Sequence, residues 1–119
     1  MDDGFRVDVS HVDGVATVTA QGEIDMSTAA LLEHVLDQFE PCERVVVDLA
    51  GVDFMDSTGL AVLVVQSALR LNAGGSLHVS RASMPVRHLL DVAGLDDMIE
   101  TKVTGQSAPC NLARFSVTR

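Results

Sequence analysis

Residues 44–60 of the chain have the sequence R-V-V-V-D-L-A-G-V-D-F-M-D-S-T-G-L. The β-branched run at 44–49 predicts an inner strand that is buried on both faces of a sheet. The pattern that follows predicts a helix from about residue 58 to residue 72, which ends before a pair of glycines at 74–75. The segment between them is therefore a junction where a strand ends and a helix begins. Three oxygen-bearing side chains lie at this junction: Asp56, Ser57 and Thr58.

The residues before this junction predict a pair of strands and a helix. Residues 5–9 alternate between apolar and polar side chains, and residues 15–20 are rich in β-branched residues. The Asp-Gly pair at 13–14 is typical of a type I′ hairpin turn. We expect Ser27 or Thr28 to cap the helix that follows. Two features support this helix. Apolar residues recur at helical spacing, at Leu32, Val35, Leu36 and Phe39, and Pro41 is expected to end the helix.

The residues after the junction predict another strand and a third helix. Residues 77–79 form a short run typical of a strand, and Ser83 with Pro85 favours the start of a helix. Gly94 stands in the usual place for a left-handed helix end. Residues 98–99 are expected to begin one more short strand.

The 119 residues are enough for one domain. The order strand, strand, helix, strand, helix, strand, helix predicts an α/β fold, with a mixed β-sheet of four to five strands and helices packed on it. We expect the core of this single domain to span about residues 5–102. The apolar pattern then fades, so residues 103–119 are expected to form an irregular C-terminal segment.

The composition excludes several classes of function. Eight Lys and Arg against 17 Asp and Glu give a formal net charge of −9, which repels nucleic acids and anionic membranes. Four Phe with no Trp or Tyr leave few platforms on which bases could stack. The acidic N-terminus does not resemble a signal peptide, and no apolar run approaches a membrane span of about 20 residues. We therefore expect a cytoplasmic protein that binds another protein and needs no cofactor.

The two cysteines, Cys42 and Cys110, are far apart in the sequence and lack the spacing of a zinc site, so we expect no bound metal. In a reducing cytosol they are most simply free thiols. The alternative is a redox pair, in which a disulfide between them holds the C-terminal segment to the domain.

The side chains at the junction have a structural explanation and a functional one. Structurally, Ser57 stands where the N-cap of the helix belongs, and Ser57 or Asp56 can accept a hydrogen bond from a free N–H group of the first turn. Gly59 is unusual at this position, because glycine in a helix costs about 1 kcal/mol relative to alanine. We interpret Gly59 as leaving room for the close approach of another chain.

The helix that begins at this junction is apolar on two faces. The face predicted to pack on the sheet carries Leu60, Leu63, Val64, Ser67, Ala68 and Leu71. The second face carries Ala61, Val62, Val65 and Leu69. A helix that is apolar all round must bury its second face too, either within the domain or against a partner, and a chain of this size has little material for another covering layer.

Three motifs of the chain have counterparts in one known family. Residues 22–25, Gly-Glu-Ile-Asp, are similar to that family's turn before its first helix. Residues 56–60, Asp-Ser-Thr-Gly-Leu, are similar to its phosphorylation motif, and residues 91–95, Asp-Val-Ala-Gly-Leu, to the end of its third helix. The chain thus resembles the STAS family, which includes sulfate-transporter domains and anti-sigma factor antagonists. The C-terminal segment departs from the many members that end in an amphipathic helix.

This resemblance implies an anti-sigma factor antagonist that is regulated by phosphorylation of Ser57. The implied partner is an anti-sigma factor that is also a serine kinase, with an ATP site like that of histidine kinases. The unphosphorylated form would bind this partner and free the sigma factor, and phosphorylation would block binding. The resemblance implies that Asp56 helps to position Ser57, that Asp25 faces the partner and that Thr58 is a contact or structural residue. With Gly59, Val62 and Val65, which the helix itself suggests, the expected partner-binding residues are Asp25, Asp56, Thr58, Gly59, Val62 and Val65.

Two alternative functions compete with this interpretation. A STAS scaffold or transporter-associated module would bind a protein through the same surface without a phosphorylation cycle, although the intact motif at Ser57 argues against it. An enzyme has little support, because the chain lacks a GxxxxGK phosphate loop, Lys102 is its only lysine, and Ser57 has no nearby histidine to act as its base. We therefore expect a regulator and not an enzyme. The sequence leaves the oligomeric state open.

Overall fold

Four strands form one mixed sheet in the order β1-β2-β3-β4 in the computed structural model, which describes residues 4–99. Strand β1 (Arg6–Val12) pairs with β2 (Val15–Ile24) in the antiparallel direction. Strands β3 (Arg44–Met55) and β4 (Ser76–Ala82) extend the sheet in parallel. The prediction of a mixed α/β fold with four to five strands is confirmed.

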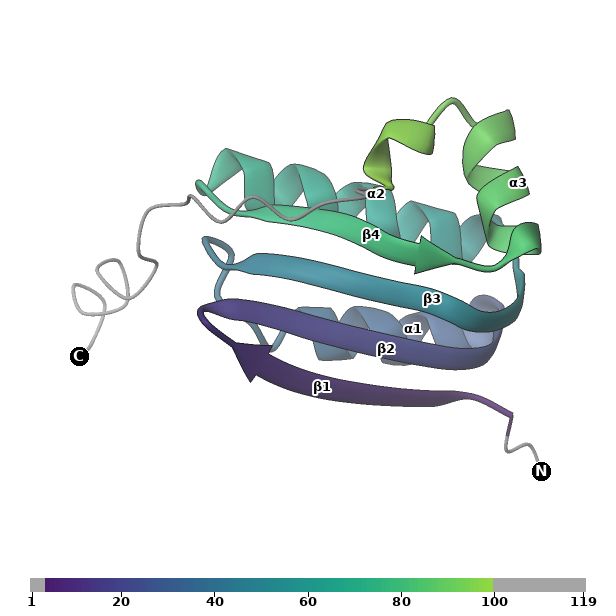
Figure 1. Cartoon of the computed structure of the whole chain (residues 1–119), viewed down its shortest axis with the longest axis horizontal. Coiled ribbons are helices and arrows are strands. Elements are labelled where there is room, and N and C mark those ends of the chain that lie inside the picture. The colour runs from purple at the N-terminus through teal and green to yellow at the C-terminus, as the bar shows by residue number, and fades with distance from the viewer. Residues whose placement is uncertain (1–3, 100–119) are drawn as a thin grey trace.

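The helices connect and cover these strands. They are α1 (Met26–Leu36), α2 (Ser57–Asn72), α3 (Met84–Val92) and a short 3-10 helix, η1 (Asp96–Met98). Helices α1 and α2 lie on the same face of the sheet, behind the strands in Figure 1, and α3 lies near the carboxyl ends of β3 and β4. Because α1 and α2 each follow a strand of the parallel β2–β3 pair, both helices begin at the same end of the sheet.

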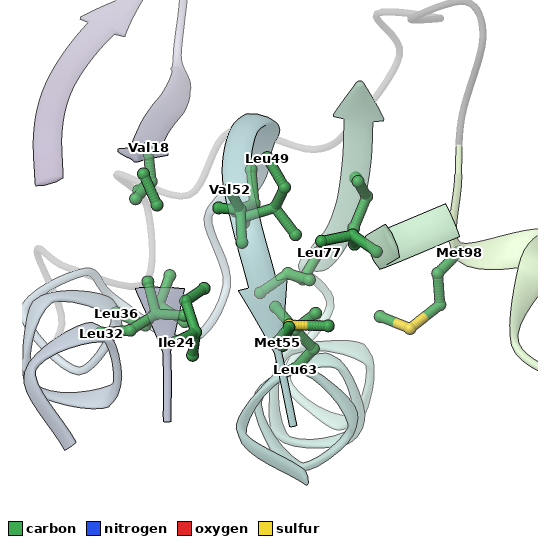
Figure 2. Close-up of a cluster of buried hydrophobic side chains, with 14 of the residues drawn as sticks. Val18, Ile24, Leu32, Leu36, Leu49, Val52, Met55, Leu63, Leu77 and Met98 are labelled. Atoms are coloured by element: carbon green, nitrogen blue, oxygen red, sulfur yellow. The ribbon is translucent and has the colours of Figure 1, made fainter. Parts of the chain in front are cut away.

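The hydrophobic core lies between the sheet and this helical layer. Figure 2 shows Val18 and Leu49 on the strands, with Leu32 and Leu36 of α1 and Leu63 of α2 beneath them. All five side chains are fully buried. Apolar residues on one face of the sheet and on the stripe of each helix therefore form a single core, as the sequence pattern predicted.

Two turn predictions are confirmed by the backbone. Asp13 and Gly14 have φ angles of 53° and 79°, and two positive values are what a type I′ hairpin turn requires. Gly94 has a φ of 76°, the left-handed conformation expected at the end of α3.

Several element boundaries differ from the predicted ones. The strand predicted at 44–49 continues to Met55, because its last residues pair with the end of β2. Helix α1 ends at Leu36, one turn earlier than expected, and Phe39 follows it as a half-buried turn residue.

The strand predicted to begin at 98–99 is only partly tested, because residues 100–119 lie outside the described residues. Residues 96–98 form η1, and Ile99 makes only an isolated parallel bridge to Val79. The predicted C-terminal segment, 103–119, lies outside the described residues. No helix within residues 4–99 is long and apolar enough to cross a membrane.

The inward face of α2 differs from the predicted one. Leu63 is buried as expected, but Gln66 and Arg70 are the other large side chains that α2 buries, with only 3% and 2% of their surface exposed. The positions that were predicted to face inward but are exposed are Val64, Ala68 and Leu71. Turning these apolar residues outward leaves a large part of α2 uncovered by residues 4–99.

The two buried polar side chains close the C-terminal end of α1. The Arg70 guanidinium donates hydrogen bonds to the carbonyl oxygens of Leu36 and Glu40. The side-chain amide of Gln66 donates to the Asp37 carboxylate at 2.8 Å. The last carbonyl groups of a helix have no partners within that helix, so these contacts explain why polar side chains are buried here.

Candidate functional site

The first turns of α1 and α2 lie next to each other at one end of the sheet. The backbone N–H of Asp56 donates a hydrogen bond to the carbonyl oxygen of Ile24, at 3.1 Å, which brings the start of α2 beside the residue that precedes α1. Asp25 is the N-cap of α1, and Asp56 is the N-cap of α2. The expectation that Ser27 or Thr28 caps α1 is therefore wrong, because the Asp25 carboxylate takes this role.

The Asp25 cap satisfies several donors at the start of α1. Its Oδ1 atom accepts hydrogen bonds from the N–H groups of Ser27 and Thr28, at 3.0 and 3.1 Å, and from the Ser27 hydroxyl at 2.9 Å. The Asp25 N–H in turn donates to the Thr28 hydroxyl oxygen at 2.8 Å, which completes a capping box. These hydrogen bonds hold the pKa of Asp25 below its ordinary value, and the bond from the Thr28 backbone N–H has the largest effect.

The Asp56 cap is built in the same way. Its Oδ1 atom accepts from the N–H groups of Thr58 and Gly59, at 2.9 and 3.4 Å, and from the Thr58 hydroxyl. The hydroxyl of Thr58 is the main cause that lowers the pKa of Asp56, while the nearby charge of Asp25 acts in the opposite direction. Two ionised carboxylates therefore lie within electrostatic range of each other at neutral pH.

Ser57 is the first residue of α2 and not its N-cap, in contrast to the prediction. Its side chain is exposed. Within residues 4–99 its hydroxyl makes no hydrogen bond, although the preceding residue, Asp56, binds the hydroxyl of Thr58. The Ser57 oxygen is therefore accessible to a second protein.

Gly59 is explained by the packing of the chain itself. It is buried, and an added Cβ atom would lie 2.6 Å from Cγ2 of Ile24 and 2.7 Å from Cγ of Met55. The interpretation that Gly59 leaves room for another chain is therefore wrong. Glycine is needed because the first turn of α2 packs directly against the ends of β2 and β3.

An exposed, mainly apolar face of α2 continues from Ser57 along the helix. We call it the outer α2 face, and its residues are Ser57, Ala61, Val64, Val65, Ala68 and Leu71. Val64 and Val65 are 40% and 50% exposed. Val62 is half-buried against the core and contributes less to this surface. The sequence left open whether the domain itself or a partner buries such a face. No part of residues 4–99 buries it.

The remaining predicted site residues are the cysteines. Cys42 lies within the described residues, just before β3. Cys110 lies outside the described residues, so the redox pair stays a prediction. No cluster of metal-binding side chains occurs among the residues that the structure describes.

Sequence reasoning missed two features of this region. The first is the Asp25 cap of α1, for which an Asp followed by Ser and Thr two and three residues later was the available signal. The second is the hydrogen-bonded Arg70 and Gln66 at the other end of α2, for which an apolar pattern gives no signal because both side chains are polar.

Comparison with known proteins agrees with the fold. Residues 6–108 match the model of the STAS domain family. An anti-sigma F factor antagonist of Paenibacillus polymyxa is 34% identical over 94 residues, which cover 76% of this chain and 80% of that protein. An anti-sigma-B factor antagonist of Bacillus subtilis is 35% identical over 97 residues, covering 81% of this chain and 89% of the relative.

A solved structure agrees with these sequence matches. The crystal structure of an anti-sigma factor antagonist from Mycobacterium paratuberculosis superimposes with a TM-score of 0.68 and 27% identity, and the match covers 95% of this chain and 93% of that one. The chain therefore belongs to the STAS domain family, within the anti-sigma factor antagonists.

Proposed function

We propose that this chain binds an anti-sigma factor that is also an ATP-dependent serine kinase, and that phosphorylation of Ser57 by this partner blocks the binding. The observation that carries the proposal is the exposed Ser57 hydroxyl, which has no hydrogen bond within residues 4–99 and lies at the head of the outer α2 face. The hydroxyl is a substrate group, and the face behind it is a surface on which a partner can dock.

A phosphate on Ser57 is compatible with the fold. It adds nearly two negative charges at the N-terminus of α2, where the helix dipole favours anions by about 0.3–1 kcal/mol. The side chain is exposed, so the phosphate needs no space inside the core. Phosphorylation is therefore expected to change what binds the surface and to leave the domain folded.

The same phosphate opposes the docking of a partner. The carboxylates of Asp25 and Asp56 cap the two neighbouring helices, and a protein that covers this region removes the water that screens all three charges. Repulsion between like charges about 6 Å apart at an effective dielectric constant of about 20 lowers affinity by about a hundredfold.

The outer α2 face supplies the apolar part of the proposed contact. Exposed apolar residues that adjoin a polar group are typical of protein interaction sites. Val65 contributes its exposed side chain, Val62 a partly buried one, and Thr58 lies beside Ser57. We place Gly59 beneath this surface, where it allows the first turn of α2 to pack closely. Occupation of the anti-sigma factor by this surface would release its sigma factor.

The proposal is tested with Ser57 variants as baits in the native cell. Ser57→Ala is expected to retain an ATP-binding anti-sigma factor in the presence of ATP, and Ser57→Asp is expected to lose it. Ser10→Asp is a matched control, because it adds the same charge at an exposed site on β1 and should retain the partner. Equal retention by Ser57→Ala and Ser57→Asp would contradict the proposal and would favour a scaffold without a phosphorylation cycle.

A further inference from the structure

We infer that Asp56 decides which of two adjacent hydroxyls accepts the phosphate, by holding the hydroxyl of Thr58 and leaving that of Ser57 unbound. This inference rests on the proposed function and adds a specificity-determining residue to it. Asp56 acts through its hydrogen bonds to the chain, so it is a positioning residue.

The two hydroxyls have different surroundings, although they belong to consecutive residues. The Thr58 hydroxyl donates to Oδ1 of Asp56, and the same oxygen accepts the Thr58 N–H at 2.9 Å. Thr58 is half-buried, whereas Ser57 is exposed. Within residues 4–99 the Asp56 carboxylate accepts hydrogen bonds from Thr58 and Gly59, and none from Ser57.

Helix α1 provides an internal comparison for this geometry. Its N-cap, Asp25, accepts a hydrogen bond from the hydroxyl of Ser27, which is the second residue of α1, at 2.9 Å. Met26, the first residue of α1, points outward and is 74% exposed. In both helices the cap carboxylate holds the hydroxyl at the second position and leaves the first side chain exposed. The choice of Ser57 over Thr58 therefore follows from the cap itself.

The chemistry of phosphoryl transfer makes this difference matter. The attacking hydroxyl oxygen forms a bond to the γ-phosphorus of ATP, the bond from that phosphorus to the bridging oxygen breaks, ADP leaves, and a base of the kinase takes the hydroxyl proton. The Thr58 proton is directed at Asp56, whose lowered pKa makes it a poor proton acceptor. Thr58 must break this bond before it can react, which slows it by about tenfold to a hundredfold relative to Ser57.

The phosphorylated product would also be less favourable at Thr58. Its phosphate would replace a hydroxyl that donates to Asp56, so a hydrogen bond would become a contact between two anions. A phosphate on Ser57 replaces no hydrogen bond within residues 4–99. Reactivity and product stability therefore favour the same residue.

The test maps the phosphate by mass spectrometry on the full chain expressed in its native host. The wild-type chain is expected to carry phosphate on Ser57 at a level at least about tenfold above that on Thr58. Ser57→Ala should carry on Thr58 at most about a tenth of the phosphate that the wild type carries on Ser57. The double variant Ser57→Ala/Asp56→Gly should gain phosphate on Thr58, because glycine keeps most of the N-cap preference but removes the carboxylate. Ser57→Ala/Asp25→Gly is the matched control and should gain none.

Each other result contradicts the inference. Phosphate on Thr58 in Ser57→Ala, at the level found on Ser57 in the wild type, overturns the inference and leaves the proposed function standing. The double variant Ser57→Ala/Asp56→Gly also overturns the inference if it carries no phosphate on Thr58. This holds whether or not the single variant Asp56→Gly keeps its phosphate on Ser57. Wild-type chain without phosphate while its kinase is active contradicts the proposed function and the inference together.

A measurement without a kinase checks the hydrogen bond itself. The Thr58 hydroxyl proton is expected to exchange slowly enough to be observed by NMR at low temperature in the wild type, and to be lost in Asp56→Gly. Asp25→Gly should keep it. A Thr58 hydroxyl signal that persists in Asp56→Gly would overturn the inference.

Discussion

The N–H of Asp56 donates a hydrogen bond to the carbonyl oxygen of Ile24, at 3.1 Å, and this bond joins the start of α2 to the end of β2. Asp25 follows Ile24 directly, so the bond brings two capping carboxylates to one place. Ser57 follows Asp56 directly, so its hydroxyl is presented at the same place. The parallel pairing of β2 with β3 thus creates the electrostatic surroundings of the proposed phosphorylation site.

Acid should destabilise the domain through its two helix caps. Hydrogen bonds lower the pKa of Asp25 and of Asp56 below the ordinary value of 3.8, so both carboxylates stabilise the fold fully above that pH. Their contribution is lost as the pH falls from 3.8 through the lower pKa of the folded state. The variant Asp56→Asn should therefore show a weaker pH dependence of its thermal midpoint between about pH 5 and pH 2. Circular dichroism measures this, with Asp53→Asn, an exposed carboxylate that caps no helix, as the control. Identical slopes for Asp56→Asn and the wild type would refute the role of the cap.

Replacement of Arg70 should destabilise the fold at the end of α2 that lies away from Ser57. Arg70→Met removes the donors to the carbonyl oxygens of Leu36 and Glu40, which costs about 2–4 kcal/mol in free energy of unfolding. Arg81→Met is the matched control, because the Arg81 side chain is 69% exposed and its ion pair with Asp48 is worth at most about 1 kcal/mol. Urea denaturation compares the two. If Arg70→Met and Arg81→Met lower the free energy of unfolding equally, the buried contacts of Arg70 do not stabilise α1.

Polar substitutions on the outer α2 face should weaken partner binding without unfolding the domain. Val65→Gln and Val64→Gln replace exposed apolar side chains, so the thermal midpoint should change little. Affinity for the anti-sigma factor should fall by about tenfold if these residues lie in the interface. Val92→Gln, which replaces a valine on α3 that is 70% exposed, should leave affinity unchanged. Loss of affinity for Val92→Gln alone would place the interface elsewhere.

The redox pair of Cys42 and Cys110 stays a prediction. Titration of thiols in the denatured chain should give none after oxidation and two after reduction, because these are the only cysteines. Two titratable thiols under both conditions would remove the redox pair.

The sequence predicted those elements whose signals are local. The β-branched run that starts at Arg44, the Asp-Gly turn at 13–14 and the glycine at 94 each act through their own backbone preferences, and each was found where expected. Family membership agrees with the expectation of a regulator and not an enzyme, since the relatives are named as anti-sigma factor antagonists.

Features that depend on distant contacts could not be predicted in this way. Asp, Ser and Thr are similar in their preference for N-cap positions, so propensity alone does not separate Asp56 from Ser57. Pairing of β3 with β2 as far as Met55 fixes the first residue of α2. Gly59 is explained by the nearby side chains of Ile24 and Met55. Arg70 is explained by the carbonyl groups of Leu36 and Glu40, which are 34 and 30 residues away in the chain.

The central claim is that one phosphate on Ser57 decides whether the anti-sigma factor binds. Isothermal titration calorimetry with the purified anti-sigma factor should compare the unphosphorylated chain, the chain phosphorylated on Ser57 and the Ser57→Ala variant. We expect similar affinities for the unphosphorylated chain and for Ser57→Ala, and an affinity lower by about a hundredfold for the phosphorylated chain. Phosphorylated chain that binds as tightly as the unphosphorylated chain would contradict the central claim.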